Sequence, residues 1–438
     1  MDLVVSSLRS RGMIMTLSAS VKGFRARPCV YTGFDPTAPS LHVGNLLPLL
    51  ALARARLVGA DVIALLGGAT SQIGDPSGKS AERNLLPAET ARANAETIAT
   101  QVTSIMQGIG GVGEFKVVNN LDWYRDMNAL DFLIDVGRFA RVGTMMSRES
   151  VRSRMQDSTA GMSFTEFSYQ LFQAHDFYHL HSRFGCAMQL GGSDQWGNIC
   201  SGIDLIRRRG GAEAFGLALP LLTTAAGEKF GKSEGNAVWL DPARTSPFEF
   251  YQVSPHHLFR LTVLLQFFRG TTDEDVADYL NYFTFIPSEN IEEIVRRNET
   301  DLGSAQAALA KSVTAIVHGD KEAQEAHLRA SLLFSGEKNR VTASTLQKAF
   351  GNDSRPFPRA LLGEPLVDVA ATVGACPSRS AAKKLVREGG LYVLANTGKG
   401  MEMEKVGANR VVDERCLVDG CALLLRAGKT RFHLVTTS

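Results

Sequence analysis

The sequence predicts an α/β fold with a parallel sheet, followed by a mostly helical region and a small α+β module at the C-terminus. Three observations support this. Patterns of buried strands alternate with helical patterns over the first 240 residues, which is typical of parallel βαβ units. Residues 241–335 show helical spacing almost throughout. Strand and helix patterns resume near Leu366, after residues 336–365, whose glycines, prolines and polar residues indicate a linker.

Length and composition indicate a globular protein of two or three domains. The chain has 438 residues, a net charge of +2 and 44% apolar residues, so it can bury a sizeable core. A nucleic-acid partner would therefore bind a local basic patch. The six cysteines form no C-x-x-C pair, which disfavours a zinc site and fits a reducing compartment. No apolar run reaches the ~18 residues that would span a bilayer.

The stretch from Tyr31 to Asn45 reads YTGFDPTAPSLHVGN. An apolar strand pattern ends at Tyr31, a glycine and two prolines follow, and a helical pattern starts after Ser40. Because His42 and Asn45 are three residues apart, both can face one ligand from the first turn of that helix. Free N–H groups and the helix dipole favour an anion there.

The next predicted elements are a strand over residues 61–68, the loop GDPSGKSAER and a helix over about 87–109. The GKS in the loop resembles the end of a phosphate-binding P-loop. That motif requires a glycine where Ile73 stands, so we reject it. The loop still places Lys79 and Arg83 near a strand end, where phosphates bind.

A long helix predicted over residues 164–180 carries polar side chains on one face. The chain before it predicts a strand and turn over residues 115–123, a helix over 130–139 and a mobile surface segment with weak periodicity over 141–162. Tyr169, Gln173 and Asp176 recur at i, i+4 and i+7, among aromatic and apolar neighbours. Buried polar groups need partners, so this face suits a ligand with a cationic group. A solvated surface is the alternative.

Strand, glycine-rich turn and helix recur after residue 185. Residues 186–190 predict a strand, and GGSDQWGN then leads into a helix. Asp194 and Gln195 lie at this junction, where a carboxylate can bind ribose hydroxyls. After a short strand predicted at 220–224, Lys229 and Lys232 lie on a loop between glycines. They suit a clamp on pyrophosphate, and a solvated charged loop is the alternative.

The C-terminal module contains a helix with one basic face. Arg379, Lys383 and Arg387 recur at i, i+4 and i+8, with Lys384 beside them. Such a face can contact the phosphate backbone of RNA. A solvated helix face is the alternative.

Five motifs in this order resemble those of the tyrosyl-tRNA synthetases, a family of class I aminoacyl-tRNA synthetases. HVGN resembles the first class I signature and KFGKS the second, with GDPSGK, FTEFSYQLFQAHDF and QLGGSDQWGN between them. The resemblance covers nearly the whole chain. It implies a Rossmann-like catalytic domain over residues 1–240, with a connective insertion over about 115–185. An α-helical anticodon-binding domain (241–345) and an S4-like RNA-binding module (366–438) would follow.

The resemblance assigns a role to each matching residue. Tyr31 and Asp176 match the pair that holds the phenol of tyrosine, and Asp75 joins Tyr169 and Gln173 around the α-ammonium. All tyrosine-binding positions are Tyr31, Asp75, Asn120, Tyr169, Gln173, Asp176 and Gln195. The ATP-binding positions are Gly33, Asp35, His42, Gly44, Asn45, Gly191, Asp194 and Lys232. The catalytic positions are Thr37, His42, Asn45, Lys79, Arg83, Lys229, Lys232 and Ser233. The tRNA-binding positions are Arg379, Lys383, Lys384 and Arg387.

The implied reaction activates tyrosine with ATP and transfers it to the 3′ end of tRNA(Tyr). The tyrosine carboxylate is already a nucleophile, so catalysis requires positioning and charge stabilisation rather than a general base. Mg²⁺ would accompany ATP, and no tightly bound protein metal is expected. No membrane partner is expected either. The family forms homodimers, with residues near 115–165 as the implied interface. The basic, Ser-rich N-terminus resembles a mitochondrial presequence and favours the mitochondrial matrix. The same residues suit an ordinary N-terminal helix equally well, and the cytoplasm is the alternative compartment.

The sequence departs from the family pattern at several places. Asn45 stands where many members have histidine, Thr32 replaces a cysteine seen in bacterial relatives, and KFGKS lacks the usual central Met-Ser. Residues 253–265 are additional relative to the family pattern, either as a true insertion or as a retained stretch of wrongly translated sequence, and we expect them to be poorly ordered or to protrude. The rival readings are a tryptophanyl-tRNA synthetase, disfavoured by Tyr31 and Asp176, and a structural RNA-binding protein. An inactive protein is disfavoured by His42 and the two lysines of KFGKS.

Overall fold

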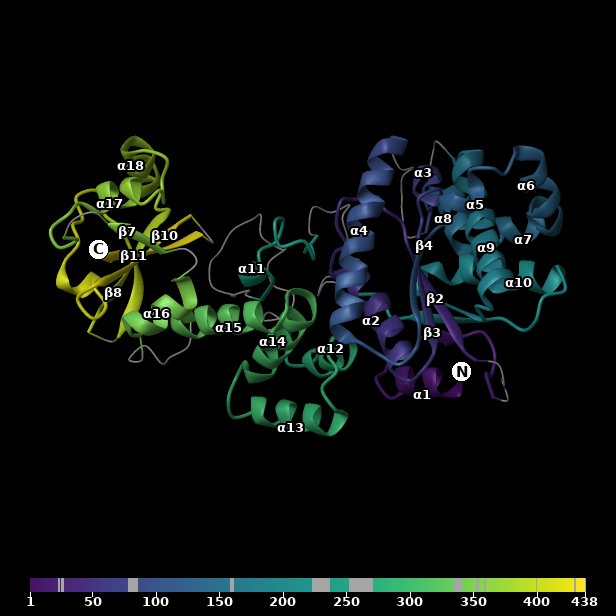
Figure 1. The fold of residues 1–438 in the computed structure, drawn as a ribbon, viewed down its shortest axis with the longest axis horizontal. Helices are drawn as coiled ribbons and strands as arrows, with labels where there is room; N and C mark the ends of the chain where they lie inside the picture. Colours follow the sequence, from purple (N-terminus) through teal and green to yellow (C-terminus); the bar gives the residue numbers. More distant parts are fainter. Residues whose placement is uncertain are drawn as a thin grey trace. The chain divides into compact units, whose positions relative to one another are not determined.

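The structure is a computed structural model that describes residues 1–22, 24, 27–77, 86–157, 161–222, 237–251, 271–334, 341–351, 354–357, 360–398, 400–428 and 431–437. Its contacts divide the chain into two compact units. Unit 1 comprises residues 1–245, 257–267 and 271–309, and unit 2 comprises residues 246–256, 268–270 and 310–438. Figure 1 shows their elements. The additional residues 253–265 lie outside the described residues, as do Lys79, Arg83, Lys229, Lys232 and Ser233.

Unit 1 is built on a six-stranded sheet with the order β1-β6-β5-β2-β3-β4. These strands are β1 (Thr16–Leu17), β2 (Cys29–Phe34), β3 (Asp61–Leu66), β4 (Phe115–Asn119), β5 (Met188–Gly192) and β6 (Phe215–Leu219). All neighbours are parallel except β1, which is antiparallel to β6. The predicted parallel sheet is confirmed. The last strand was misplaced at 220–224: the fully buried run FGLAL forms it instead, and Pro220 offers no N–H to extend the ladder.

Helices cover both faces of this sheet. They include α2 (Val43–Leu57), α3 (Thr70–Ile73), α4 (Ala88–Ile109), α9 (Phe164–Phe184) and α10 (Trp196–Arg208). Figure 1 shows the sheet between α2 and α4 on one side and α9 and α10 on the other. Local sequence sets the ends of α9: the Ser163 side chain accepts a hydrogen bond from the Glu166 N–H, and Gly185 follows with φ 64°. These are a helix N-cap and a left-handed C-terminal residue.

The segment between β4 and β5 is more regular than expected. It contains α5 (Leu121–Tyr124), α6 (Ala129–Asp135), η1 (Gly137–Phe139), α7 (Val142–Met146) and α8 (Glu149–Asp157) before α9. The weak periodicity of 141–162 did not predict the helices α7 and α8, and the mobility expected there stays a prediction. Its apolar periodicity is weak because α8 packs partly through charge. Arg154 and Glu166 are 3% and 4% exposed and form an ion pair at 2.8 Å.

Shorter helices complete unit 1. They are α1 (Asp2–Arg9), α12 (Val276–Phe283), α13 (Ser288–Asn298) and the first part of α14 (Ser304–His318). The N-terminal helix α1 buries Val4, Val5 and Leu8 and contacts α2. Within the described residues, no helix is long and apolar enough to cross a membrane.

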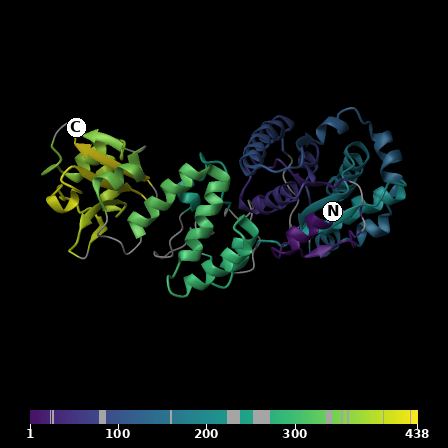
Figure 2. The same ribbon diagram turned by 60° about the horizontal axis from the view of Figure 1, so that its bottom comes forward.

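Unit 2 combines helices with a second sheet. Its helical elements are α11 (Pro247–Tyr251), the rest of α14, α15 (Asp320–Phe334), α16 (Ala343–Phe350), α17 (Leu366–Thr372), α18 (Arg379–Arg387) and η6 (Glu414–Cys416). The sheet has the order β7-β11-β10-β8-β9 and contains β7 (Ser354–Phe357), β8 (Leu391–Asn396), β9 (Met401–Lys405), β10 (Ala422–Ala427) and β11 (Arg431–Thr437). Figure 2 shows these strands packed with helices near the C-terminus. The α+β module is confirmed, but the linker predicted at 336–365 contains α16 and β7.

Candidate active site

Tyr31 lies within β2 with its side chain buried under α9. It is 1% exposed, and its ring centroid lies 5.2 Å from that of Phe177. Its hydroxyl has no hydrogen-bond partner within the described residues. Burial, and after it the charge of Asp176, raises the pKa of Tyr31 well above the ordinary value. A buried, unpartnered hydroxyl near a carboxylate fits a ligand that both donates and accepts a hydrogen bond.

Asp176 is held by two donors that precede it by more than fifty residues in the chain. The side chain of Asn120 donates to Oδ2 and the indole of Trp123 donates to Oδ1, each at 3.0 Å. Asp176 is only 2% exposed, and burial raises its pKa from 3.8 to about 7 although both hydrogen bonds oppose the rise. Sequence reasoning missed Trp123. Its position three residues after Asn120, about one helical turn, could have indicated that both side chains reach the same partner.

Asp35 directly follows β2 and is hydrogen-bonded to a residue that follows β3. Tyr169 donates its hydroxyl to Asp35 Oδ2 at 2.8 Å, and Thr70 donates to Oδ1 at 2.6 Å. Gly67 permits this approach, because a Cβ there would lie 1.9 Å from Asp35 Oδ1. The structure thus links Tyr169 to Asp35, whereas the resemblance grouped Tyr169 with Asp75.

Asp75 forms a separate cluster with the start of α10. Gln195 donates to Asp75 Oδ2 at 2.7 Å, and Asn198 donates to Oδ1 at 3.4 Å. Gln173 is half-buried and makes no side-chain hydrogen bond within the described chain. The three residues expected around an ammonium group are therefore not hydrogen-bonded to one another without a ligand. Asn198 was not anticipated, although it lies three residues after Gln195.

The first turn of α2 is closed by a reciprocal cap. His42 Nδ1 accepts from the Gly44 N–H, and the side-chain oxygen of Asn45 accepts from the His42 N–H, both at 3.1 Å. Since Nδ1 accepts, Nε2 carries the proton in a neutral His42 ring. His42 and the Asn45 amide N–H₂ thus lie beside a helix N-terminus, which suits a phosphate. Thr37 belongs to the preceding turn, where its N–H donates to the Asp35 carbonyl.

The carboxyl ends of β2 and β5 lie side by side, with Thr32 in register with Leu190. The chain leaves these neighbours in opposite directions across the sheet, to β3 and to β6, which is where open α/β sheets bind ligands. A Cβ at Gly33 would meet nothing within 4 Å, whereas one at Gly191 would lie 3.0 Å from Gln195 Cβ. Asp194 follows in the short helix η2 (Ser193–Gln195).

The predicted RNA-binding residues lie on α18 in unit 2. Arg379, Lys383, Lys384 and Arg387 are all exposed, while Ala382 and Val386 are buried on the opposite side. Arg379 pairs with Asp368 at 2.5 Å, and Lys384 lies 3.9 Å from Glu388. Lys383 and Arg387 are the less engaged members of this face.

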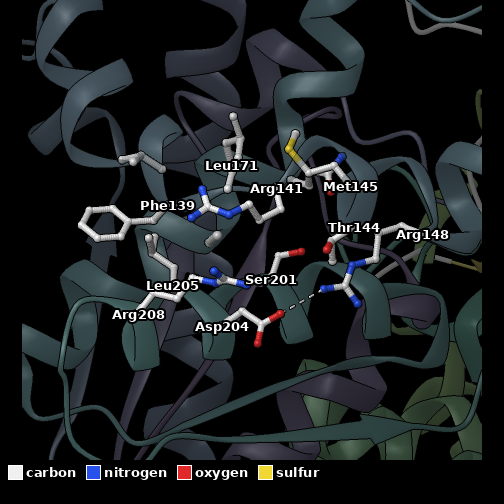
Figure 3. A pocket seen from close by; sticks show the side chains of 14 residues that line it. Phe139, Arg141, Thr144, Met145, Arg148, Leu171, Ser201, Asp204, Leu205 and Arg208 are labelled. Atoms are coloured by element: carbon white, nitrogen blue, oxygen red, sulfur yellow. Dashed lines mark ion pairs between the residues drawn. The ribbon is translucent and has the colours of Figure 1, made fainter.

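A different pocket lies between α7, α9 and α10 (Figure 3). Arg148 and Asp204 face each other across it at 3.7 Å, with Leu171 and Leu205 in its apolar lining. None of the residues predicted to bind tyrosine or ATP lines this pocket. No group of three or more His, Cys, Asp or Glu side chains that could hold a metal ion occurs in the described ranges.

Comparisons with known proteins agree with this geometry. Residues 25–335 match the model of the family described as tRNA synthetases class I (W and Y). The tyrosine–tRNA ligase of Roseiflexus castenholzii is 40% identical over 99% of both chains, and that of Rhodopirellula baltica is 43% identical over 93% of this chain and 89% of its own. A C-terminally truncated mitochondrial tyrosyl-tRNA synthetase of Aspergillus nidulans is 32% identical, with a TM-score of 0.65 over 75% of this chain and 93% of its own. The chain therefore belongs to the class I tRNA synthetases and, within them, to the tyrosine–tRNA ligases.

Proposed function

We propose that the chain forms tyrosyl-adenylate from tyrosine and ATP and then transfers tyrosine to the 3′ end of tRNA(Tyr). The observation that carries this proposal is the buried, unpartnered hydroxyl of Tyr31 beside Asp176. A phenol placed there would donate to the carboxylate and accept from Tyr31. Phenylalanine would leave both groups unpaired and buried, which opposes its binding.

Activation needs the tyrosine carboxylate to attack the α-phosphate of ATP in line. Asp75, Gln173 and Tyr169 would hold the ammonium group, and Asn120 would keep Asp176 in place. His42 and Asn45 would donate to the phosphates from the start of α2. Gly33 leaves room for the nucleotide, and Asp194 would bind the ribose. Mg²⁺ would accompany ATP and neutralise phosphate charge.

Tyrosine-dependent pyrophosphate exchange and charging of tRNA(Tyr) test this proposal. Tyrosine should support both reactions, and tryptophan and phenylalanine neither. A preference for tryptophan would favour the other branch of the matching family. RNA binding without any exchange or charging would instead favour a structural RNA-binding protein.

The tRNA would be bound by the predicted anticodon-binding domain (241–345) and by the S4-like module (366–438). The second assignment is supported by the exposed basic face of α18. Lys383 and Arg387 have no ion-pair partner within the described chain, so both are available to phosphates.

We propose a homodimer that forms through the segment between β4 and α9. This segment and the first residue of α9, Phe164 at 75%, expose several large apolar side chains. They are Leu130, Leu133, Ile134, Val142 and Phe164. Exposed apolar side chains gathered on one segment mark an interface. Sedimentation of wild-type protein and of Leu130→Glu should show a dimer and a shift to monomer. A monomeric wild-type protein would contradict the proposal.

We place the enzyme in the mitochondrial matrix, with the cytoplasm as the alternative. The basic, Ser-rich N-terminus and the similarity to a mitochondrial synthetase structure support the matrix, whereas the bacterial relatives leave both open. A C-terminal fluorescent fusion of the full chain would test this. Diffuse cytoplasmic signal would overturn the matrix assignment.

A further inference from the structure

Arg54 is a buried cation at the end of α2 opposite to His42 and Asn45. Its side chain is 5% exposed and reaches the C-terminal end of α12. One guanidinium nitrogen donates to the carbonyl of Asn281 at 3.0 Å and to the carbonyl of Thr284. The first accepting residue lies in the last turn of α12 and the second directly follows it.

This guanidinium has no carboxylate partner within the described residues. Its central carbon lies 4.8 Å from the ring centroid of Phe285, in cation–π contact. Burial and, after it, repulsion by Arg11 lower the pKa of Arg54 to about 10, so it stays charged at neutral pH. The carbonyls at a helix C-terminus carry partial negative charge and stabilise such a cation.

Arg56, two residues later, makes a matching contact in another direction. Its Nε donates to the carbonyl of Gly113 at 3.0 Å, and Nη1 donates to the carbonyl of Met106 at 2.8 Å. Met106 lies in the last turn of α4. The C-terminal end of α2 is thus attached by Arg56 to α4 and the loop before β4, and by Arg54 to the end of α12.

We propose that Arg54 is a positioning residue for the tRNA-dependent step. It fixes α12 on α2, the helix whose first turn carries His42 and Asn45. Helix α12 belongs to the helical region (241–345) that the proposed function assigns to tRNA binding, and the inference therefore rests on that function. Loss of the contact would leave the tyrosine and ATP sites intact. The 3′ end of the bound tRNA would then be held less accurately against the aminoacyl-adenylate. One guanidinium nitrogen carries two hydrogens and so reaches both carbonyls, while the planar group packs on Phe285.

The test compares Arg54→Met with Arg56→Met in the full-length enzyme. Each variant removes a guanidinium that donates to two backbone carbonyls, buried at Arg54 and half-buried at Arg56, and keeps an unbranched apolar side chain. We expect Arg54→Met to lower kcat/KM for tRNA(Tyr) charging about tenfold, while tyrosine-dependent pyrophosphate exchange stays within about twofold of wild type. Arg56→Met should change the two reactions by equal factors. Arg54→Lys keeps the charge but not the planar guanidinium, so it should charge tRNA(Tyr) better than Arg54→Met and less well than wild type.

Two results would overturn the inference: equal losses of exchange and charging in Arg54→Met, or the same selective loss of charging in Arg56→Met. If Arg54→Met does not fold, Arg54→Lys and Arg56→Lys provide the same comparison below their unfolding temperatures. Wild-type enzyme that exchanges pyrophosphate but fails to charge tRNA(Tyr) would instead refute the proposed function.

Discussion

Trp123 donates its indole N–H to Oδ1 of Asp176 at 3.0 Å, and its ring stacks on His179 at 4.3 Å between centroids. Asp176 and His179 lie on α9, three residues apart, so one tryptophan is fixed by two side chains of the same helix face. The second carboxylate oxygen accepts from Asn120. This arrangement fixes the orientation of the carboxylate before any ligand arrives.

Replacement of Trp123 by phenylalanine should weaken tyrosine recognition without abolishing it. Phenylalanine keeps a ring to stack on His179 but leaves Asp176 Oδ1 without its donor. We expect the KM for tyrosine in pyrophosphate exchange to rise by about 3- to 10-fold, since a net hydrogen bond contributes about 1 kcal/mol. The KM for ATP is the internal control and should not change. An equal rise in both constants would indicate a general structural defect.

Asp176→Ala should have a larger effect. It removes the acceptor proposed for the phenol, leaves the indole N–H of Trp123 unpaired and removes one of the two acceptors of the Asn120 amide. Hydrogen bonds to charged groups contribute about 1.5–3 kcal/mol, so the KM for tyrosine should rise by roughly 10- to 100-fold. Asp204→Ala, on α10 outside this network, is the control and should leave that KM unchanged. Unchanged affinity for tyrosine in Asp176→Ala would refute the assignment of the phenol site.

The raised pKa of Asp176 predicts a pH-dependent stability difference between wild type and Asp176→Asn. The folded state holds this proton up to about pH 7, whereas the ordinary pKa is 3.8. The folded state therefore binds more protons than the unfolded state between these values, and wild-type stability falls there as pH rises. The asparagine variant has no titrating group at this position, so its free energy of unfolding lacks this decrease. Its unfolding free energy relative to wild type should increase from pH 4 to pH 7 and then level off; a flat difference in denaturant titrations would contradict the shift.

The double variant Lys383→Ala, Arg387→Ala should weaken tRNA charging while adenylate formation persists. Each lost phosphate contact should also reduce the salt dependence of tRNA binding by about one unit of log–log slope. Arg379→Ala is a matched control on the same helix face, because Arg379 already pairs with Asp368. It should have a smaller effect. Equal damage to adenylate formation in the double variant would count against a tRNA-only role for α18.

Elements with strong local signals were predicted well. The strand–loop–helix from Tyr31 to Asn45 follows from an apolar run, two prolines and a capped helix start, and the structure contains β2 and α2 there. Helices α4 and α9 also match their predicted ranges closely. The errors fall where burial is not apolar: α8 was missed because its buried Arg154 pairs with Glu166, a contact that periodicity does not reveal.

Most of the alternation of strands and helices followed from the sequence alone, because periodicity is a property of the chain itself. The candidate residues and the class of reaction followed from motifs that resemble those of a known family. The tertiary structure decided which candidates meet. It linked Tyr169 to Asp35 by a hydrogen bond, and it added Trp123 to the carboxylate of Asp176. Such pairings depend on strand order and helix packing across long sequence separations, and residue spacing does not record them. The attachment of Arg54 to α12 was decided in the same way, because 227 residues separate it from Asn281.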